Sequence, residues 1–365
     1  MVNRSDAYTV LGGDTLQMIK TAETLERLGV SVDTALADDL AACDWRYDIV
    51  HVFNIQTAEE SLWAAKEAKR RQIPVVLSPI YWDPLPGWFR DAYGGSPIWE
   101  TLSNGVGRRA AYWIYKTWQR RNYPKARIWQ QQRELLRMAD WLLPNSRAEL
   151  GQLMADFRLP RGMTCRASIV VNGIDRALYH ERPVPSDKWR KVVGDGFVLE
   201  VGRISPEKNT LALIEALWDT DVQLVFVGKP SPYSPEYAQT CVDRARKRGK
   251  VHFLGFVPYA ELPGLYALAA VHALPSWRET PGLVSLEAAA AGCRIVSTNI
   301  GSAHEYFGDA ICYCDPSNVN SISEAVSQAL AAPTILDLRE RVLGRYTWDH
   351  AAESTLRAYL EVVHT

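Results

Sequence analysis

The chain has 365 residues, and 41 Lys plus Arg balance 42 Asp plus Glu to leave a formal net charge of −1. A near-neutral chain has no global attraction for nucleic acid, so a charged partner would need a local patch. Apolar residues make up 47% of the chain, and one hydrophobic core stops growing at roughly 250 to 300 residues. The composition therefore excludes a disordered chain and predicts two globular domains.

Targeting and redox signals point to the cytoplasm. No run approaches the roughly 18 consecutive apolar residues of a membrane span, and the opening MVNRSDAYTV lacks the apolar core of a secretory signal. The cysteines contain no C-x2-C pair, which indicates reduced structural thiols and argues against a zinc site. They are Cys43, Cys165, Cys241, Cys293, Cys312 and Cys314.

Short β-branched runs alternate with longer amphipathic segments from residue 48 onward, the pattern of a parallel sheet covered by helices on both faces. The glycine pair Gly12-Gly13 arrives after only eleven residues, which indicates either a very short first strand or a sequence that starts late in it. A proline- and glycine-containing stretch, 172–196, predicts the interdomain linker. The final segment, 347–364, has a helical period and is long enough to reach back to the first domain. The predicted strands are 48–53, 73–78, 140–144, 168–171, 197–201, 222–227, 251–254, 271–275 and 294–298.

The densest group of chemically useful residues is ETPGLVSLE, at 279–287. Thr280 suits a helix N-cap, Pro281 the first helical position and Gly292 the stop, which predicts a helix over 281–291. The free amides at the start of such a helix form an anion site suited to a diphosphate.

Two carboxylates flank this predicted anion site. Glu287 lies about 9 Å along the helix axis from Pro281, whereas Glu279 precedes the helix. The alternative is that Glu279 is only a loop charge and Glu287 only a helix-surface charge.

A second group, GRISPEKN at 202–209, follows a predicted strand directly. Ser205 as N-cap and Pro206 at the first helical position predict a helix at the carboxyl end of that strand, where open α/β sheets bind ligands. Arg203 and Lys208 bring two cations that would match a nucleotide diphosphate. The alternative is an ordinary capped helix with solvated charges.

An ordered series of motifs resembles the retaining glycosyltransferases of family 4, also called group 1, which have the GT-B architecture. Residues 140–365 carry the resemblance, and the first 140 residues carry only fragments. The motifs are ADWLLPNSRAEL, SIVVNGIDRALY, VLEVGRISPEKNTLALIEAL, VFVGKP, VHFLGFVPYAELPGLYALA, HALPSWRETPGLVSLEAAAAGCRIVSTNIGSAHEYFG and TWDHAAESTLRAYL.

This resemblance implies an α/β fold of two Rossmann-like domains facing each other across a cleft. Residues 1–175 would bind the acceptor, residues 176–345 would bind the nucleotide sugar, and a helix over 346–365 would pack back on the first domain.

The resemblance also implies roles for individual residues. Arg203 and Lys208 would bind the donor diphosphate and, with Glu279, would form the catalytic group, in which Glu279 binds hydroxyls of the transferred sugar. Glu287 would bond the ribose. The further donor-binding residues would be Gly12 and Gly13 from the other domain, Gly202, Phe256 and Val257 near the nucleobase, and Pro281, Gly282, Leu283 and Val284 at the diphosphate.

The implied reaction moves a sugar with retention from a UDP- or GDP-linked donor to a saccharide or lipid-linked saccharide, in polysaccharide or glycoconjugate synthesis. The resemblance implies neither a metal ion nor another cofactor. Many relatives carry a histidine after the strand equivalent to 73–78, but here the chain reads SPIYWD. Tyr81, Asp83 and Asp14 are the candidates to replace it.

Three other functions compete with this interpretation. Asp219-Thr220-Asp221 has the D-x-D spacing of a metal-dependent glycosyltransferase, but it lies between a predicted helix over 207–218 and the strand 222–227, at the wrong edge of the sheet. A sugar-nucleotide-binding scaffold without catalysis and a sugar-nucleotide epimerase of similar architecture are the other two.

The stretch 106–137 is locally basic, with nine Arg or Lys against the single acid Glu134. Its interleaved Trp and Tyr are typical of an element at a membrane interface, which would place the first domain at the cytoplasmic membrane face. The alternative is that the aromatic side chains belong to the core and the cations to a solvated face. We expect no role in binding nucleic acid.

Overall fold

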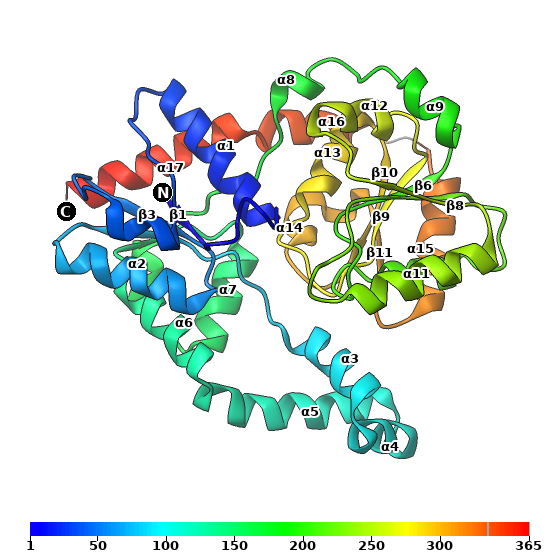
Figure 1. Ribbon diagram of the computed structural model, residues 1–365, viewed down its shortest axis with the longest axis horizontal. Coiled ribbons are helices and arrows are strands. Elements are labelled where there is room, and N and C mark those ends of the chain that lie inside the picture. The colour runs from blue at the N-terminus through cyan, green and yellow to red at the C-terminus, as the bar shows by residue number, and fades with distance from the viewer. Residues whose placement is uncertain (334–335, 365) are drawn as a thin grey trace. The chain divides into compact units, whose positions relative to one another are not determined.

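The computed structural model describes residues 1–333 and 336–364 (Figure 1). The chain divides into two compact units. The first unit consists of Met1–Asn172 together with the chain from Trp348 onward, and the second unit is Gly173–Thr347. In the described part of the chain, no helix is both long and apolar enough to cross a bilayer.

The first unit is built on a parallel sheet with the strand order β2-β1-β3-β4-β5. Strands β3 and β4 are buried along their whole length, as expected where helices cover both faces. The predicted strands 48–53, 73–78 and 140–144 are confirmed. The strands are β1 (Val2–Asn3), β2 (Ala35–Leu36), β3 (Val50–Phe53), β4 (Val75–Ser78) and β5 (Trp141–Leu142).

The predicted strand 168–171 is wrong. Ala167 makes one isolated bridge to Leu142, and the amides of Ser168 and Val170 donate to the carbonyls of Leu142 and Pro144 at 3.0 Å each. Because β5 itself ends at Leu142, this segment has almost no strand to pair with.

Helices cover the sheet of the first unit, and the last one comes from the carboxyl terminus. Helix α17 packs on α1, where Arg27 pairs with Asp349 at 3.0 Å, and Tyr359 Oη lies 2.7 Å from Nδ1 of the buried His51 on β3. The predicted return of the final helix to the first unit is therefore confirmed. The helices are α1 (Gly13–Arg27), η1 (Ala37–Ala42), α2 (Ala58–Arg70), α3 (Leu85–Gly95), α4 (Pro97–Val106), α5 (Arg108–Asn122), η2 (Tyr123–Lys125), α6 (Arg127–Met138), α7 (Arg147–Asp156), η3 (Arg161–Arg166) and α17 (Trp348–Val363).

The second unit is also built on a parallel sheet, with the order β11-β10-β9-β6-β7-β8. The five strands predicted for this half are confirmed. The additional strand, β11, lies in the short apolar run ICYC, which carried no strand period. The strands are β6 (Val198–Val201), β7 (Leu224–Val227), β8 (Val251–Gly255), β9 (Val271–Leu274), β10 (Arg294–Thr298) and β11 (Cys312–Cys314).

The predicted linker 172–196 is folded onto the second unit. It contains two short helices, and the side chains of Tyr179, Trp189 and Val193 are buried. These apolar anchors lacked the spacing of a regular amphipathic segment. The helices of this unit are α8 (Arg176–Tyr179), α9 (Asp187–Val193), α10 (Thr210–Ala216), α11 (Pro235–Arg248), η4 (Tyr259–Glu261), α12 (Leu262–Tyr266), α13 (Leu283–Ala291), α14 (Ala303–Phe307), η5 (Gly308–Ala310), α15 (Val319–Ala331) and α16 (Leu336–Arg345).

The turns after β6 and β7 touch each other through glycine. Gly228 has a φ of +138°, and a Cβ there would lie 1.9 Å from the carbonyl oxygen of Gly202. We expect Gly228→Ala to lower the free energy of unfolding by about 3 kcal/mol or more, because the clash is with backbone. Urea unfolding measures this change.

Gly151→Ala is the matched control for this prediction. Gly151 lies within α7 with nothing within 4 Å of the added carbon, so alanine should stabilise the protein by about 0.5 to 1 kcal/mol. Equal unfolding midpoints for Gly228→Ala and the wild type would contradict the close approach.

Candidate functional site

An ion pair joins the two groups of residues that the sequence singled out. Lys208 Nζ donates to Glu279 Oε1 at 2.6 Å, although 71 positions separate the two residues. Lys208 follows β6 and Glu279 follows β9, and these strands are neighbours in the sheet. Their side chains are only 28% and 8% exposed. The pair therefore lies at the carboxyl edge of the sheet and is largely shielded from solvent.

The predicted helix start at Ser205 and Pro206 is wrong. The amides of Lys208 and Asn209 both donate to the carbonyl of Ser205 at 3.2 Å, which makes a single turn. Asn209 then adopts the left-handed conformation with φ of 66°, and α10 begins only at Thr210.

Tertiary contacts hold Asn209 in that conformation. Its Nδ2 donates to the carbonyls of Pro275 at 3.1 Å and Pro316 at 2.8 Å. This buried side chain interrupts the helix that the capping pattern predicted and holds Lys208 in the turn before it.

The predicted start of the next helix also needs correction. The Thr280–Pro281 peptide bond is cis, Gly282 is the N-cap with φ of 90°, and α13 begins at Leu283. The predicted stop at Gly292 is confirmed. The amides of Leu283 and Val284 are in the first turn of α13, where no acceptor is available within the helix. The helix start therefore moves two residues along the chain, from Pro281 to Leu283, and the predicted anion site lies at the amides of Leu283 and Val284.

The Glu279 carboxylate lies against the start of α13. A Cβ at Gly282 would be 3.3 Å from Glu279 Oε2. Both backbone polar groups of Glu279 are hydrogen-bonded. Its amide donates to the carbonyl of Ile300 at 3.2 Å, and its carbonyl accepts from the amide of Ser302 at 3.0 Å. Glu279 is therefore a fixed group and not a solvated loop charge.

Glu287 is buried within the second unit. Tyr266 Oη donates to Glu287 Oε2 at 3.1 Å, and burial raises the pKa of this carboxyl to about 7. This position contradicts the alternative of a helix-surface charge.

Two buried titratable groups near this edge were missed by the sequence analysis. Burial raises the pKa of Glu200 on β6 to about 8, and Thr210 Oγ1 donates to its Oε1 at 2.6 Å. Burial lowers the pKa of His272 on β9 to about 3, and its Nδ1 lies 3.5 Å from Ser285 Oγ. Both shifts favour the neutral form of the group. The sequence feature that could have identified Glu200 and His272 is a polar residue inside an otherwise apolar strand.

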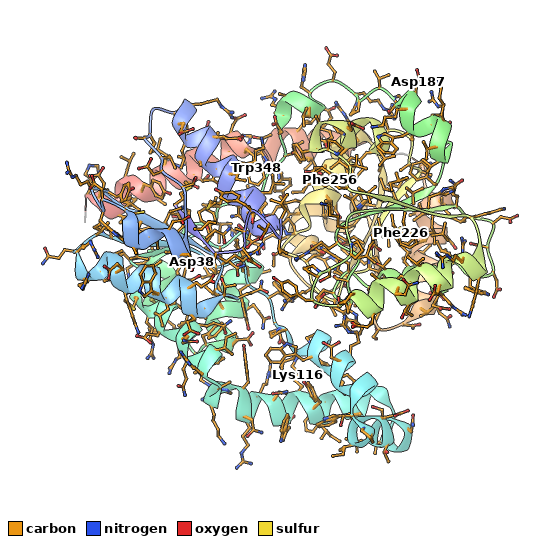
Figure 2. All side chains as sticks on the ribbon, viewed as in Figure 1. Asp38, Lys116, Asp187, Phe226, Phe256 and Trp348 are labelled. Atoms are coloured by element: carbon orange, nitrogen blue, oxygen red, sulfur yellow. The ribbon has the colours of Figure 1, made fainter. Side chains whose placement is uncertain are left out.

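Arg203 is an exposed cation on the same edge, and within the described part of the chain it forms no ion pair. The preceding Gly202 leaves room for Lys208, whose Cε would be 3.4 Å from a Cβ at that position. Two residues after β8, Val257 is buried, whereas Phe256 is 60% exposed with Lys229 Nζ 5.6 Å from its ring centroid (Figure 2).

In the first unit, Gly12 is the N-cap of α1 and Gly13 is the first residue of that helix. Asp14 is buried and accepts hydrogen bonds from Arg4 Nε at 2.9 Å and Asn54 Nδ2 at 3.1 Å. These bonds fix the start of α1 beside the ends of β1 and β3.

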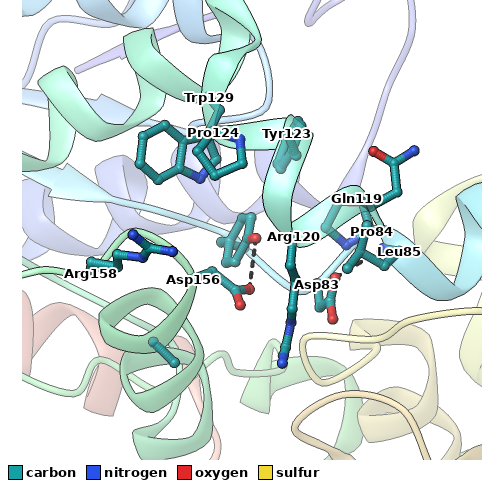
Figure 3. A pocket seen from close by; sticks show the side chains of 12 residues that line it. Asp83, Pro84, Leu85, Gln119, Arg120, Tyr123, Pro124, Trp129, Asp156 and Arg158 are labelled. Atoms are coloured by element: carbon teal, nitrogen blue, oxygen red, sulfur yellow. Dashed lines mark hydrogen bonds between the residues drawn. The ribbon is translucent and has the colours of Figure 1, made fainter. Parts of the chain in front are cut away.

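Tyr81 and Asp83 line a cavity of about 260 Å³ that lies wholly in the first unit (Figure 3). Tyr81 Oη donates to Asp156 at 2.9 Å, and the amide of Leu85 donates to Asp83 at 2.9 Å. Burial raises the pKa of Asp83. The remaining lining residues are Pro84, Leu85, Gln119, Arg120, Tyr123, Pro124, Trp129, Ala155, Asp156 and Arg158.

Acidic residues are not gathered into a metal site in the described ranges, where no three His, Cys, Asp or Glu side chains are grouped suitably. Asp219 and Asp221 lie in the turn between α10 and β7, at the amino end of that strand, and Lys250 Nζ donates to Asp221 at 2.7 Å. The carboxyl edge that carries Lys208 and Glu279 is the opposite edge.

Sequence comparison assigns most of the second unit to a family. Residues 182–344 match the model of the glycosyl transferases group 1. These residues belong to the group 1 glycosyl transferase family. The predicted resemblance is thereby confirmed, and the glycosyl transferase domain contains Lys208, Arg203, Glu279 and Glu287.

A curated relative is the O-antigen chain mannosyltransferase B of Escherichia coli, 31% identical over 173 residues, which are 45% of this chain and 45% of the relative. The chain spans about half the length of the curated relatives it matches.

Solved structures extend the likeness beyond the glycosyl transferase domain. Sucrose-phosphate synthase from Thermosynechococcus elongatus has a TM-score of 0.74 at 16% identity and covers 100% of this chain and 99% of its own. Anabaena HepE, solved in complex with UDP and glucose, has a TM-score of 0.65 at 18% identity and covers 100% and 98%. The predicted GT-B fold of two Rossmann-like domains is confirmed.

Proposed function

We propose that this protein is a retaining glycosyltransferase that moves a sugar from a UDP- or GDP-linked donor to a saccharide or lipid-linked saccharide. The observation that carries the proposal is the Lys208–Glu279 pair at the start of α13. It combines a cation and free helix amides for a diphosphate with a fixed carboxylate for sugar hydroxyls. Membership of residues 182–344 in the group 1 family supports it.

The donor diphosphate would be bound by Arg203, Lys208 and the amides of Leu283 and Val284. As the bond to the sugar breaks, negative charge grows on the leaving phosphate, and these fixed positive groups stabilise it. Glu279 would hold the transferred sugar and favour the positive charge that develops on its ring. Release of the leaving group through these residues requires no metal ion.

The acceptor saccharide would occupy the cavity beside Tyr81 and Asp83. Its aromatic walls, including Trp129, suit the apolar face of a sugar ring, and the carboxylates of Asp83 and Asp156 accept hydrogen bonds from hydroxyls. Arg120 and Arg158 add donors. Tyr81 and Asp83 in this pocket would replace the histidine that many relatives carry after the equivalent strand.

A test of the reaction class is the release of nucleoside diphosphate from a panel of UDP- and GDP-sugars, with and without EDTA. We expect slow release from one donor without acceptor, at a rate that EDTA changes by less than about twofold, because the cations on the protein carry the charge. The same assay with the Lys208→Ala variant gives the background rate of donor breakdown.

Each alternative function has its own outcome in the same assay. Loss of activity in EDTA with rescue by magnesium or manganese would establish metal dependence. Conversion of the donor to an isomeric sugar nucleotide would identify an epimerase. Tight binding with no release from any donor, even with saccharide acceptors added, would leave a binding scaffold.

A further inference from the structure

Helices α3, α4 and α5 form a small core of their own in the first unit (Figure 1). Phe89, Ala111 and Tyr115 are buried there, and Tyr112 packs against them. Part of the aromatic content of 106–137 is therefore core. Tyr123 packs against Trp88. Trp129 packs against Phe157 in the larger core of the first unit.

Two tryptophans of α5 are exposed, although one side of the Trp118 ring lies against Trp99 and Tyr115, with ring centroids 6.1 Å and 6.3 Å away. Trp113 is 68% exposed and Trp118 51% exposed, and Ile114 lies between them. Residues 113, 114, 117 and 118 share one side of a helix with 3.6 residues per turn. On α4, which packs on α5, Ile98 and Val106 are also exposed. Scattered single apolar residues are normal on a surface, but two exposed tryptophans and an exposed isoleucine on one side of a helix indicate a binding surface.

The charge of α5 has one sign. Its sequence RRAAYWIYKTWQRRN contains five cations and no acidic residue, in a chain of net charge −1. Lys116 (Figure 2), Arg120 and Arg121 make no ion pair with any residue in the described ranges. The side chains of Arg108 and Arg109 lie outside the described residues.

This composition selects among possible occupants of the surface. A second copy of the chain would place cation against cation across a two-fold axis, which opposes self-association. An anionic bilayer satisfies both features at once, because tryptophan and isoleucine enter the headgroup boundary while Lys and Arg contact lipid phosphates.

We propose that the exposed face of α5, formed by Trp113, Ile114, Thr117, Trp118 and Arg121, binds an anionic lipid bilayer. Gln119 and Arg120, on the same helix, line the cavity beside Tyr81. Membrane binding would therefore bring that cavity to the bilayer surface, where a lipid-linked substrate would be presented. The membrane contact itself does not depend on the proposed glycosyl transfer.

The test is cosedimentation of the full chain with phosphatidylcholine vesicles that contain or lack phosphatidylglycerol, at low and at physiological salt. We expect binding to the anionic vesicles only, and weaker binding at higher salt because charges on the surface are screened. Arg120→Glu with Arg121→Glu should weaken binding by more than tenfold, since each cation contributes about fivefold near an anionic surface. Trp113→Ala with Trp118→Ala should weaken it at both salt concentrations.

Matched controls separate the surface from general charge and folding effects. Trp63→Ala removes an exposed tryptophan from α2, and Arg246→Glu with Lys247→Glu makes the same charge change on α11. Both should bind as the wild type does, and a cooperative melting transition in every variant should show that it is folded.

Three results would overturn the proposal. The first is wild-type protein that stays in the supernatant with anionic vesicles at both salt concentrations. The second is equal binding by the α5 variants and their controls. The third is self-association of the wild type that the double tryptophan variant abolishes, in the absence of lipid binding. Donor release measured in solution is independent of all three, so failure here leaves the proposed reaction standing.

Discussion

Replacing Glu279 by glutamine will lower turnover by about 100-fold or more, while nucleoside diphosphate affinity changes by less than about threefold. The substitution keeps the shape of the side chain and removes only its charge. The lost charge is the one that we place beside the transferred sugar. In the wild type, Glu279 Oε1 accepts a hydrogen bond from Lys208 Nζ at 2.6 Å. Initial rates with a saturating donor, together with calorimetric titration of the diphosphate, measure the two effects separately.

A second Lys–Glu pair in the same unit provides the control. Lys188 and Glu261 are joined at 2.8 Å on the surface, where their side chains are 61% and 36% exposed. Glu261→Gln should leave both turnover and affinity unchanged, because exposed pairs contribute little. Wild-type turnover in Glu279→Gln would show that the donor geometry proposed here is wrong.

Arg203→Ala and Lys208→Ala will each weaken nucleoside diphosphate binding by about tenfold or more, because a charge-assisted hydrogen bond contributes about 1.5 to 3 kcal/mol. Their effects on stability should differ. Arg203 is exposed, so its loss leaves the free energy of unfolding within about 0.5 kcal/mol of the wild type. Lys208→Ala leaves the mostly buried Glu279 carboxylate without its cation, so this variant should also be destabilised.

The double variant Lys208→Met with Glu279→Gln tests this explanation. It removes both charges, so it should recover the stability lost in Lys208→Ala without recovering diphosphate affinity. Arg246→Ala, on the exposed side of α11, is the binding control. Unchanged affinity in both single variants would remove the diphosphate assignment from these residues.

The sheet strands could be predicted from sequence because their signal is local. Runs such as VVLS and LVFV are apolar and β-branched, and they are buried on both faces. Strands β1 and β2 have two residues each, too few to show any period.

Helix starts were predicted less well because tertiary contacts decide them. Ser-Pro and Thr-Pro are good capping patterns, yet both helices begin later, after a left-handed residue. Asn209 adopts that conformation through bonds to Pro275 and Pro316, which are far along the chain. No local pattern encodes those partners.

The candidate site shows the same division. The residue types and their place after a strand predicted that Lys208 and Glu279 would serve one ligand, but not that they bond to each other, which depends on β6 and β9 being neighbours. Glu200 and His272 were missed because each is a single polar residue in an apolar strand, and no nearby motif separates a functional residue from a structural one.

Hydrogen exchange of the wild-type protein with and without UDP or GDP tests the central claim most directly, because it locates the bound donor without reference to the acceptor. We expect one of the two nucleotides to slow exchange in peptides that cover 202–209 and 279–287, where the ligand would bond the amides at the start of α13. Protection confined to other segments, or none at saturating concentrations of either nucleotide, would contradict a donor site built on Lys208 and Glu279.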